Sequence, residues 1–393
     1  MESLKELYRV GPGPSSSHTL AIKRICDYYL ERFKDDAPYD VTLYGSLALT
    51  GKGHMTDQIV LNTLGKERTV IHFSNEYKEH PNTILIRSAH HELTFYSVGG
   101  GAFTIKGEPS IVDENVYPEN SMEEIEQFCA ENHLNLYQYA QLREPGIYEY
   151  LYDILKHMFR TVESGLETEG ILPGKLKLQR VAKTLYRQAL DERDPKTKKD
   201  LMITAFAYAC SEENAAGGIV TTAPTLGSCG VLPSVLYYFR YIEGVSERKL
   251  TEALAVGGLY GNVIKTNASI SGAEGGCQAE IGTACAMAAG AISWVKGLPA
   301  HQISYAAEIA IEHNLGLTCD PVGGYVMIPC IERNGVAALR AFDASLYADH
   351  LGRIRPNRVS FDKVVQTMKY TGKKIARELR ETSLGGLATE LKV

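Results

Sequence analysis

The sequence predicts an α+β protein, in which a small mixed domain of strands and helices precedes a larger, mostly α-helical domain. The 393 residues, 44% of them hydrophobic and 22% charged, are enough for two domains with separate cores. Short β-branched segments concentrate between residues 41 and 106, whereas long helical patterns dominate from about residue 145. We therefore place one domain at residues 1–135 and another at residues 145–393.

In the first domain, the strand signal comes from short runs of β-branched and aromatic residues that turn formers separate. These runs are residues 41–44, 69–73, 83–86 and 93–96. Two helices are expected to accompany the small sheet. One covers residues 19–33, and the other covers residues 121–132, where Ser121 and Glu124 have the spacing of a capping box.

The second domain is expected to be helical because apolar residues recur there with the spacing of one helix face. The predicted helices are residues 147–168, 175–192, 198–211, 246–265, 278–296, 301–314 and 361–382. Glycine-rich connections interrupt them at residues 217–230, 271–276 and 319–324.

Composition and charge exclude several classes of protein. A net charge of -6 with scattered basic residues supplies no face for nucleic acid. The charged, amphipathic first seven residues lack the apolar core of a secretory signal, so a cytoplasmic protein is expected. The apolar run 281–295 ends at Lys296 and is too short to cross a membrane. Eight cysteines in a long cytoplasmic chain do not form a disulfide framework.

A serine-rich loop, Ser15-Ser16-Ser17-His18-Thr19, lies directly before the first predicted helix. A helix start offers unpaired backbone amides and a positive dipole end, and hydroxyls beside it can receive a carboxylate. His18 adds a group that can move a proton near neutral pH. The alternative is a capped helix with a surface histidine.

A second glycine-rich turn, Gly51-Lys-Gly-His-Met-Thr-Asp57, presents His54 and Asp57 together. These two side chains are candidates for orienting a substrate or tuning His18. The alternative is an ordinary loop followed by a capped helix.

Three cysteines occupy unusual settings near glycine or proline: Cys277, Cys319 and Cys330. Their gaps of 42 and 11 residues match no zinc-ribbon or ferredoxin spacing, so spacing leaves both metal ligands and buried structural thiols open. Cys229 follows a glycine-rich bend and is a reserve candidate. The remaining cysteines lie in helical patterns and are expected in the core.

These segments resemble the iron–sulfur L-serine dehydratases. Gly13-Pro-Ser-Ser-Ser-His-Thr19 and the turn at residues 51–57 resemble the beta-type part of that family. The run from Gly261 to Glu274, Cys319-Asp-Pro-Val-Gly-Gly and Pro329-Cys-Ile-Glu-Arg-Asn334 resemble the alpha-type part. The order of these segments is that of the single-chain form, and the first domain resembles the allosteric substrate-binding domain of some phosphoglycerate dehydrogenases.

The resemblance implies a 4Fe-4S cluster and an activity. Cys277, Cys319 and Cys330 would bind three irons, and the fourth iron, free of cysteine, would act as a Lewis acid on the hydroxyl of L-serine. His18 would be the base, and pyruvate and ammonia the products, as in amino-acid degradation that feeds gluconeogenesis. The implied substrate-binding residues are Ser15, Ser16, Ser17, Thr19, His54, Asp57, Asn267, Ser269 and Ser271. The active site would form between the domains, and a homodimer is expected.

The chain departs from the family pattern at three places. Leu226 stands where asparagine is usual, Met327 stands where glutamine is usual, and residues 387–393 lack the terminal cysteine that enters the active site in some members. Two other functions stay open. One is a pyridoxal-phosphate deaminase with Lys265 as the Schiff-base lysine. The other is a non-catalytic amino-acid sensor with a structural metal.

Overall fold

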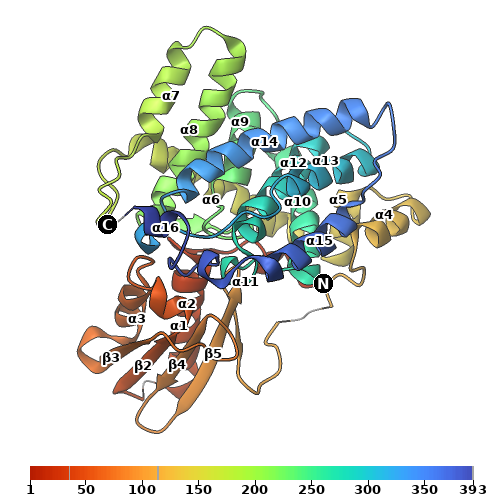
Figure 1. Cartoon of the computed structure of the whole chain (residues 1–393). Coiled ribbons are helices and arrows are strands. Elements are labelled where there is room, and N and C mark those ends of the chain that lie inside the picture. Colours follow the sequence, from red (N-terminus) through yellow and green to blue (C-terminus); the bar gives the residue numbers. More distant parts are fainter. Residues whose placement is uncertain (35, 113–114, 392–393) are drawn as a thin grey trace.

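The computed structural model describes residues 1–34, 36–112 and 115–391, and it has the predicted α+β fold. A small sheet with its helices lies on one side of a larger helical body, and α11 and α15 lie near the boundary (Figure 1). The last two residues of the tail, 392 and 393, lie outside the described residues. The strands are β1 (Val10–Pro12), β2 (Tyr39–Tyr44), β3 (Thr69–Ser74), β4 (Thr83–Arg87), β5 (Glu92–Gly99), β6 (Ala102–Ile105) and β7 (Ile219–Thr221).

Strands β2 to β6 form one mixed sheet with the order β3-β2-β4-β5-β6. Strands β2 and β3 are parallel, and the other neighbours are antiparallel. The four predicted strands are confirmed, and β6 was not predicted. The buried side chains of these strands share a core with α1 (Ala21–Phe33) and α3 (Thr56–Leu64).

The helical body contains most of the remaining elements. Helix α2 (Ser46–Leu49) lies beside the sheet instead. The helices of the body are α4 (Met122–Glu131), α5 (Leu136–Arg143), α6 (Ile147–Glu167), α7 (Ala182–Asp191), α8 (Pro195–Ala215), α9 (Val231–Tyr241), α10 (Glu247–Asn267), α11 (Gly272–Gly275), α12 (Thr283–Val295), α13 (Ala300–Glu312), α14 (Cys330–Leu351), α15 (Phe361–Lys374) and α16 (Leu387–Glu390). All seven predicted helices have counterparts, but α7 begins later than expected because Ile171 and Gln179 form a β-bridge. The pattern missed α9 and α14.

The two cores divide the chain differently from the predicted boundary. The smaller core uses residues 22–105, whereas Leu4, Leu7 and Leu20 belong to the larger, helical core. Strand β1 pairs with β7, which ties the N-terminus to the helical body.

Helix α4, expected to accompany the sheet, packs on the helical core because its buried side chains Met122, Ile125 and Cys129 face that core. At the first turn of α4, the backbone N–H groups donate hydrogen bonds to the carboxylate of Asp362, which belongs to α15. Among the residues that the structure describes, none of the helices has the length and apolar character needed to span a membrane.

Candidate active site

The serine-rich loop is held tightly between the two parts of the molecule. Ser15 caps a short π-helical turn, Ser16–Leu20, through a hydrogen bond from the His18 backbone N–H to its hydroxyl. Gly13 lies so close to the backbone of α8 that an added Cβ would be 2.3 Å from the carbonyl oxygen of Asn214. Only glycine fits there, and the close approach buries His18 completely, with 0% exposure.

The hydrogen bonds of His18 assign its basic nitrogen. Its Nε2 lies 3.2 Å from the carbonyl oxygen of Ser46 and 2.8 Å from Oγ1 of Thr50. A carbonyl oxygen only accepts, so the network places the hydrogen of the neutral ring on Nε2. The lone pair is then on Nδ1, which lies 3.3 Å from Oγ of Ser15 and 3.5 Å from Oε1 of Glu381.

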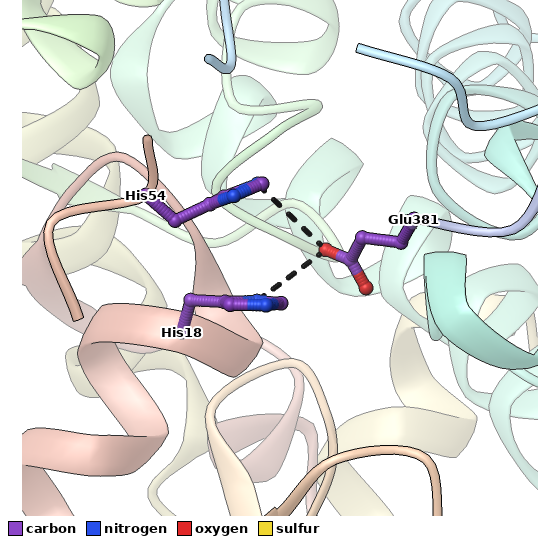
Figure 2. A group of neighbouring side chains, drawn as sticks. All are labelled: His18, His54 and Glu381. Carbon is purple, nitrogen blue, oxygen red and sulfur yellow. Dashed lines mark ion pairs between the residues drawn. The ribbon is translucent and has the colours of Figure 1, made fainter. Parts of the chain in front are cut away.

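His54 stacks on His18 and faces the same carboxylate. The ring centroids are 4.3 Å apart with an interplanar angle of 22°. Nδ1 of His54 lies 3.1 Å from the carbonyl oxygen of Thr50, and this bond leaves the lone pair on Nε2, 4.0 Å from Oε1 of Glu381. Figure 2 shows both imidazoles directed at the Glu381 carboxylate.

Burial shifts all three groups away from their ordinary protonation behaviour. Burial, helped by the neighbouring His54, lowers the pKa of His18 well below its usual value. Burial also lowers the pKa of His54 to about 4. Burial, and then the charge of Glu280, raises the pKa of Glu381 well above its usual value. Both imidazoles are therefore neutral at neutral pH and able to accept a proton.

Glu381 comes from the C-terminal segment and joins the two halves of the site. Its backbone N–H donates to the carbonyl oxygen of Cys319 at 2.7 Å, and its own carbonyl oxygen accepts from the Ser46 hydroxyl at 2.6 Å. Its Oε2 is buried without a hydrogen-bond partner within the described chain. Glu381 could not be predicted as a site residue, because no local motif surrounds it.

The three cysteines line one small cavity together with Ser15, His54, Glu280 and Glu381. Cys277 precedes a π-helical turn, Cys319 lies in extended backbone beside Arg380, and Cys330 is the first residue of α14. The irregular backbone expected at Cys330 is instead a helix start. Cys229, the reserve candidate, is buried and does not line this cavity.

The cavity wall has the chemistry of a site for soft metal ions. Burial raises the pKa of Cys277 to about 11, while the Arg333 guanidinium beside it acts in the opposite direction. Burial raises the pKa of Cys319 and of Cys330 as well. Arg333 would balance the charge of the thiolates, and Glu280 lies 4.0 Å from Sγ of Cys319. Three thiols around one buried space fit an iron–sulfur cluster.

Several predicted substrate-binding residues have other partners. The Ser16 hydroxyl accepts from the Leu226 backbone N–H at 2.7 Å, and the Thr19 hydroxyl donates to the Ser15 carbonyl oxygen at 2.6 Å. Ser17 is buried outside the cavity wall. These side chains build the loop that carries His18.

The remaining predicted residues do not line the cavity. Asp57 accepts from the Gln58 backbone N–H, and Asn267 donates to the Asn120 carbonyl oxygen. The Ser269 hydroxyl donates to Glu274 at 2.6 Å. Ser271 is buried, and its hydroxyl has no partner within the described residues. Met327 packs in a small separate core, and Leu226 in the main one.

Lys265, the lysine of the pyridoxal-phosphate alternative, lies away from this cavity. Its ammonium group forms an ion pair with Glu2 and also donates to the Glu6 carbonyl oxygen at 3.3 Å. A Schiff-base lysine must reach the reacting carbon. The pair with Glu2 turns Lys265 toward the N-terminus instead.

Known proteins match this chain over nearly all of it. Residues 3–70 match the family model of the serine dehydratase beta chain, and residues 97–388 match that of the alpha chain. The chain is 38% identical to an L-serine dehydratase of Haemophilus influenzae and 38% identical to L-serine dehydratase 2 of Escherichia coli, with 100% of this chain and 99% of each relative aligned. An L-serine dehydratase of Helicobacter pylori is 36% identical over 99% of both chains. The chain therefore belongs to the serine dehydratase family, with the beta-type and alpha-type parts in one polypeptide.

Proposed function

We propose that this protein is an L-serine dehydratase that converts L-serine to pyruvate and ammonia with a bound 4Fe-4S cluster. The observation that carries the proposal is a single buried cavity. Ser15 and His54 reach it from the N-terminal part, and three cysteines reach it from the helical body. His18 stacks on His54, and both imidazoles contact the Glu381 carboxylate.

Cys277, Cys319 and Cys330 would hold the cluster, because all three cysteines line the same cavity. When bound, the cluster supplies a Lewis acid for the departing hydroxyl of the substrate. Arg333 compensates the charge that the thiolates bring into the buried site. The fold therefore provides both sulfur ligands and a counter-charge.

His18 would take the α-proton of L-serine on Nδ1. The Ser46 carbonyl oxygen and Thr50 fix the opposite nitrogen, so the ring presents its lone pair in one direction. Its lowered pKa keeps this lone pair free at neutral pH. Loss of the α-proton and of the hydroxyl as water leaves aminoacrylate, which tautomerises to an imine and hydrolyses to pyruvate and ammonia.

Ser15 and Glu381 would position the reacting groups. The Ser15 hydroxyl lies 3.3 Å from the basic nitrogen of His18 and lines the cavity, so it can also reach a substrate carboxylate. Glu381 contacts both histidines and would fix the orientation of their rings relative to each other. Ser16, Ser17 and Thr19 would then act through the loop that they stabilise.

The test is pyruvate formation from L-serine by anaerobically purified protein whose iron and sulfide contents are measured. The proposal expects turnover that increases with iron content. Full activity that requires pyridoxal phosphate and no iron would contradict the cluster. A fully clustered protein that binds L-serine without forming pyruvate would favour the sensor function. The cytoplasmic location and the homodimer stay predictions.

A further inference from the structure

A large cleft opens on the face of α11 opposite the catalytic cavity. It lies between the β3–β4 loop (residues 77–81), residues 268–275, helix α15 and the segment that follows α15. Its volume of about 480 Å³ is within the range typical of small-molecule sites. We call it the basic cleft.

Positive side chains dominate the wall of the basic cleft. The wall holds five basic side chains and two acidic ones, which is a formal excess of three positive charges on a chain whose net charge is -6. The basic residues are Lys78, Lys369, Lys373, Arg377 and Arg380, and the acidic residues are Glu79 and Glu274. Such a local excess concentrates anions at the cleft.

Both acidic side chains already have partners. The Glu79 carboxylate accepts from the Tyr96 hydroxyl at 2.6 Å and from Lys106 at 2.9 Å. The Glu274 carboxylate accepts from the Ser269 hydroxyl at 2.6 Å and lies 3.2 Å from Nε2 of His80. The Glu79 charge is thus compensated by Lys106, which lies outside the cleft wall, whereas Glu274 keeps its charge and interacts electrostatically with Arg380.

Among the described residues, Lys78 forms an ion pair with Glu76, whereas the other four basic side chains have no carboxylate within ion-pair distance: Lys369, Lys373, Arg377 and Arg380. Lys369 and Lys373 are four residues apart on α15, and like charges at that spacing destabilise a helix. The Arg377 guanidinium lies flat on the Tyr77 ring, 3.3 Å from its centroid, so it is fixed in place. These uncompensated positive charges favour the binding of an anion at the wall of the cleft.

Helix α11 lies between the thiol of Cys319 and the basic cleft. A Cβ at Gly272 would lie 3.3 Å from Sγ of Cys319, whereas Ala273, Glu274 and Gly275 line the cleft. Gly372 lets α15 approach this partition, since an added Cβ would lie 3.1 Å from Cα of Gly275. The two spaces are adjacent and have different walls.

We propose that the basic cleft is a second binding site, which takes a small multivalent anion such as a phosphate ester or a polycarboxylate. An excess of three positive charges attracts such an anion far more strongly than a zwitterionic amino acid, whose net charge is zero. Arginine and lysine supply charge-assisted hydrogen bonds of the kind that bind phosphate and carboxylate groups. The proposal does not depend on the dehydratase activity.

The test is calorimetric titration of the full-length protein with inorganic phosphate and, separately, with citrate at constant ionic strength. We expect saturable binding of at least one probe. Changing Lys369 and Lys373 together to glutamine should weaken it about tenfold or more, because two charge-assisted contacts are lost. Lys374→Gln is the matched control: it changes a neighbouring lysine of α15 that does not line the cleft, and it should change the affinity less than about twofold.

The two probes distinguish the ligand class. Saturation by phosphate alone identifies a phosphoryl group, and saturation by citrate alone identifies a polycarboxylate. Binding must persist in His18→Ala, whose changed residue lies in the catalytic site. If neither probe saturates below about 10 mM, if Lys374→Gln weakens binding as much as the double change, or if L-serine displaces the probe, the proposal is wrong.

Discussion

The two faces of α11 differ in how they use charge. On one face, the candidate active site contains His18, His54 and Glu381, which are at most 5% exposed. On the other face, Lys369, Lys373 and Arg377 of the basic cleft are exposed to solvent. The same few residues of backbone thus separate groups that burial keeps neutral from groups that water keeps charged.

This difference in burial determines what the side chains on each face can do. Burial removes the solvation that stabilises ions, so it holds the imidazoles in the neutral form that can accept a proton. The buried thiols, in contrast, must lose their protons when they bind a metal. An exposed cation keeps its charge and attracts an anion without changing its own protonation. Changes in the cavity should therefore alter chemistry and pH dependence.

The largest effect is expected from the cavity thiols. Cys319→Ser should lower turnover by at least about a thousandfold, because the reaction loses its Lewis acid. Iron and sulfide content after anaerobic reconstitution, measured beside pyruvate formation, checks this. Cys285→Ala is the control, since that thiol is buried in α12 outside the cavity and donates to the Ala337 carbonyl oxygen. Full iron content in Cys319→Ser would remove that residue from the ligand set.

Stability should respond to the buried imidazole of His54. Its pKa is about 4 in the folded chain and near 6.5 when unfolded, so between these values the unfolded state binds more protons. The free energy of unfolding must then fall as the pH drops from 6.5 toward 4. Between pH 7 and pH 5, the native chain should lose about 2 kcal/mol more than His54→Gln.

Urea denaturation of the cluster-free protein at both pH values measures this difference. Equal losses for the native chain and for His54→Gln would show that the imidazole of His54 is not buried in its neutral form.

A change at Glu381 tests how the side chains around the cavity are held in place. Glu381→Gln should lower kcat about tenfold while KM and iron content change less than twofold, because the change disturbs two imidazoles and leaves the thiols in place. Glu378→Gln, an exposed change three residues earlier in the same segment, is the control. A rise in KM at constant kcat would instead place Glu381 in substrate binding alone.

The smallest effect is a shift in the pH profile. Burial lowers the pKa of His18, so its basic form should persist below pH 6.5 and the acid limb of kcat/KM should lie under that value. A pyruvate assay from pH 5 to pH 8, with iron content checked at each pH, gives the limb. An acid limb centred above pH 6.5 would mean that His18 is solvated or is not the base.

Local patterns predicted much of the fold, since strands β2 to β5 are short runs of β-branched and aromatic residues between turn formers, and helices such as α6 are amphipathic. Helix α14 was not predicted, because its first turn, from Cys330 to Arg333, follows a proline- and glycine-rich segment that resembles a loop. The boundary between the two cores also differs from the predicted domain boundary. Residues 1–20 pack on the helical body, and their local composition does not indicate this.

The sequence pointed to His18, His54 and the three cysteines because each lies in a distinctive glycine- or proline-rich setting. It could not reveal Glu381 or Arg333, whose roles come from long-range proximity. The hydroxyls of Ser16 and Thr19 looked available in sequence, yet backbone groups use them as hydrogen-bond partners. A residue type alone does not show whether its polar group is free.

The central claim is that a base from the N-terminal part serves a cluster held by the helical body. Its most direct test is a side-by-side assay of the native chain and His18→Ala, both with measured iron content. We expect His18→Ala to retain its iron and to lose turnover of L-serine by about a thousandfold, the scale of general-base catalysis. Normal turnover by a fully clustered His18→Ala would contradict it.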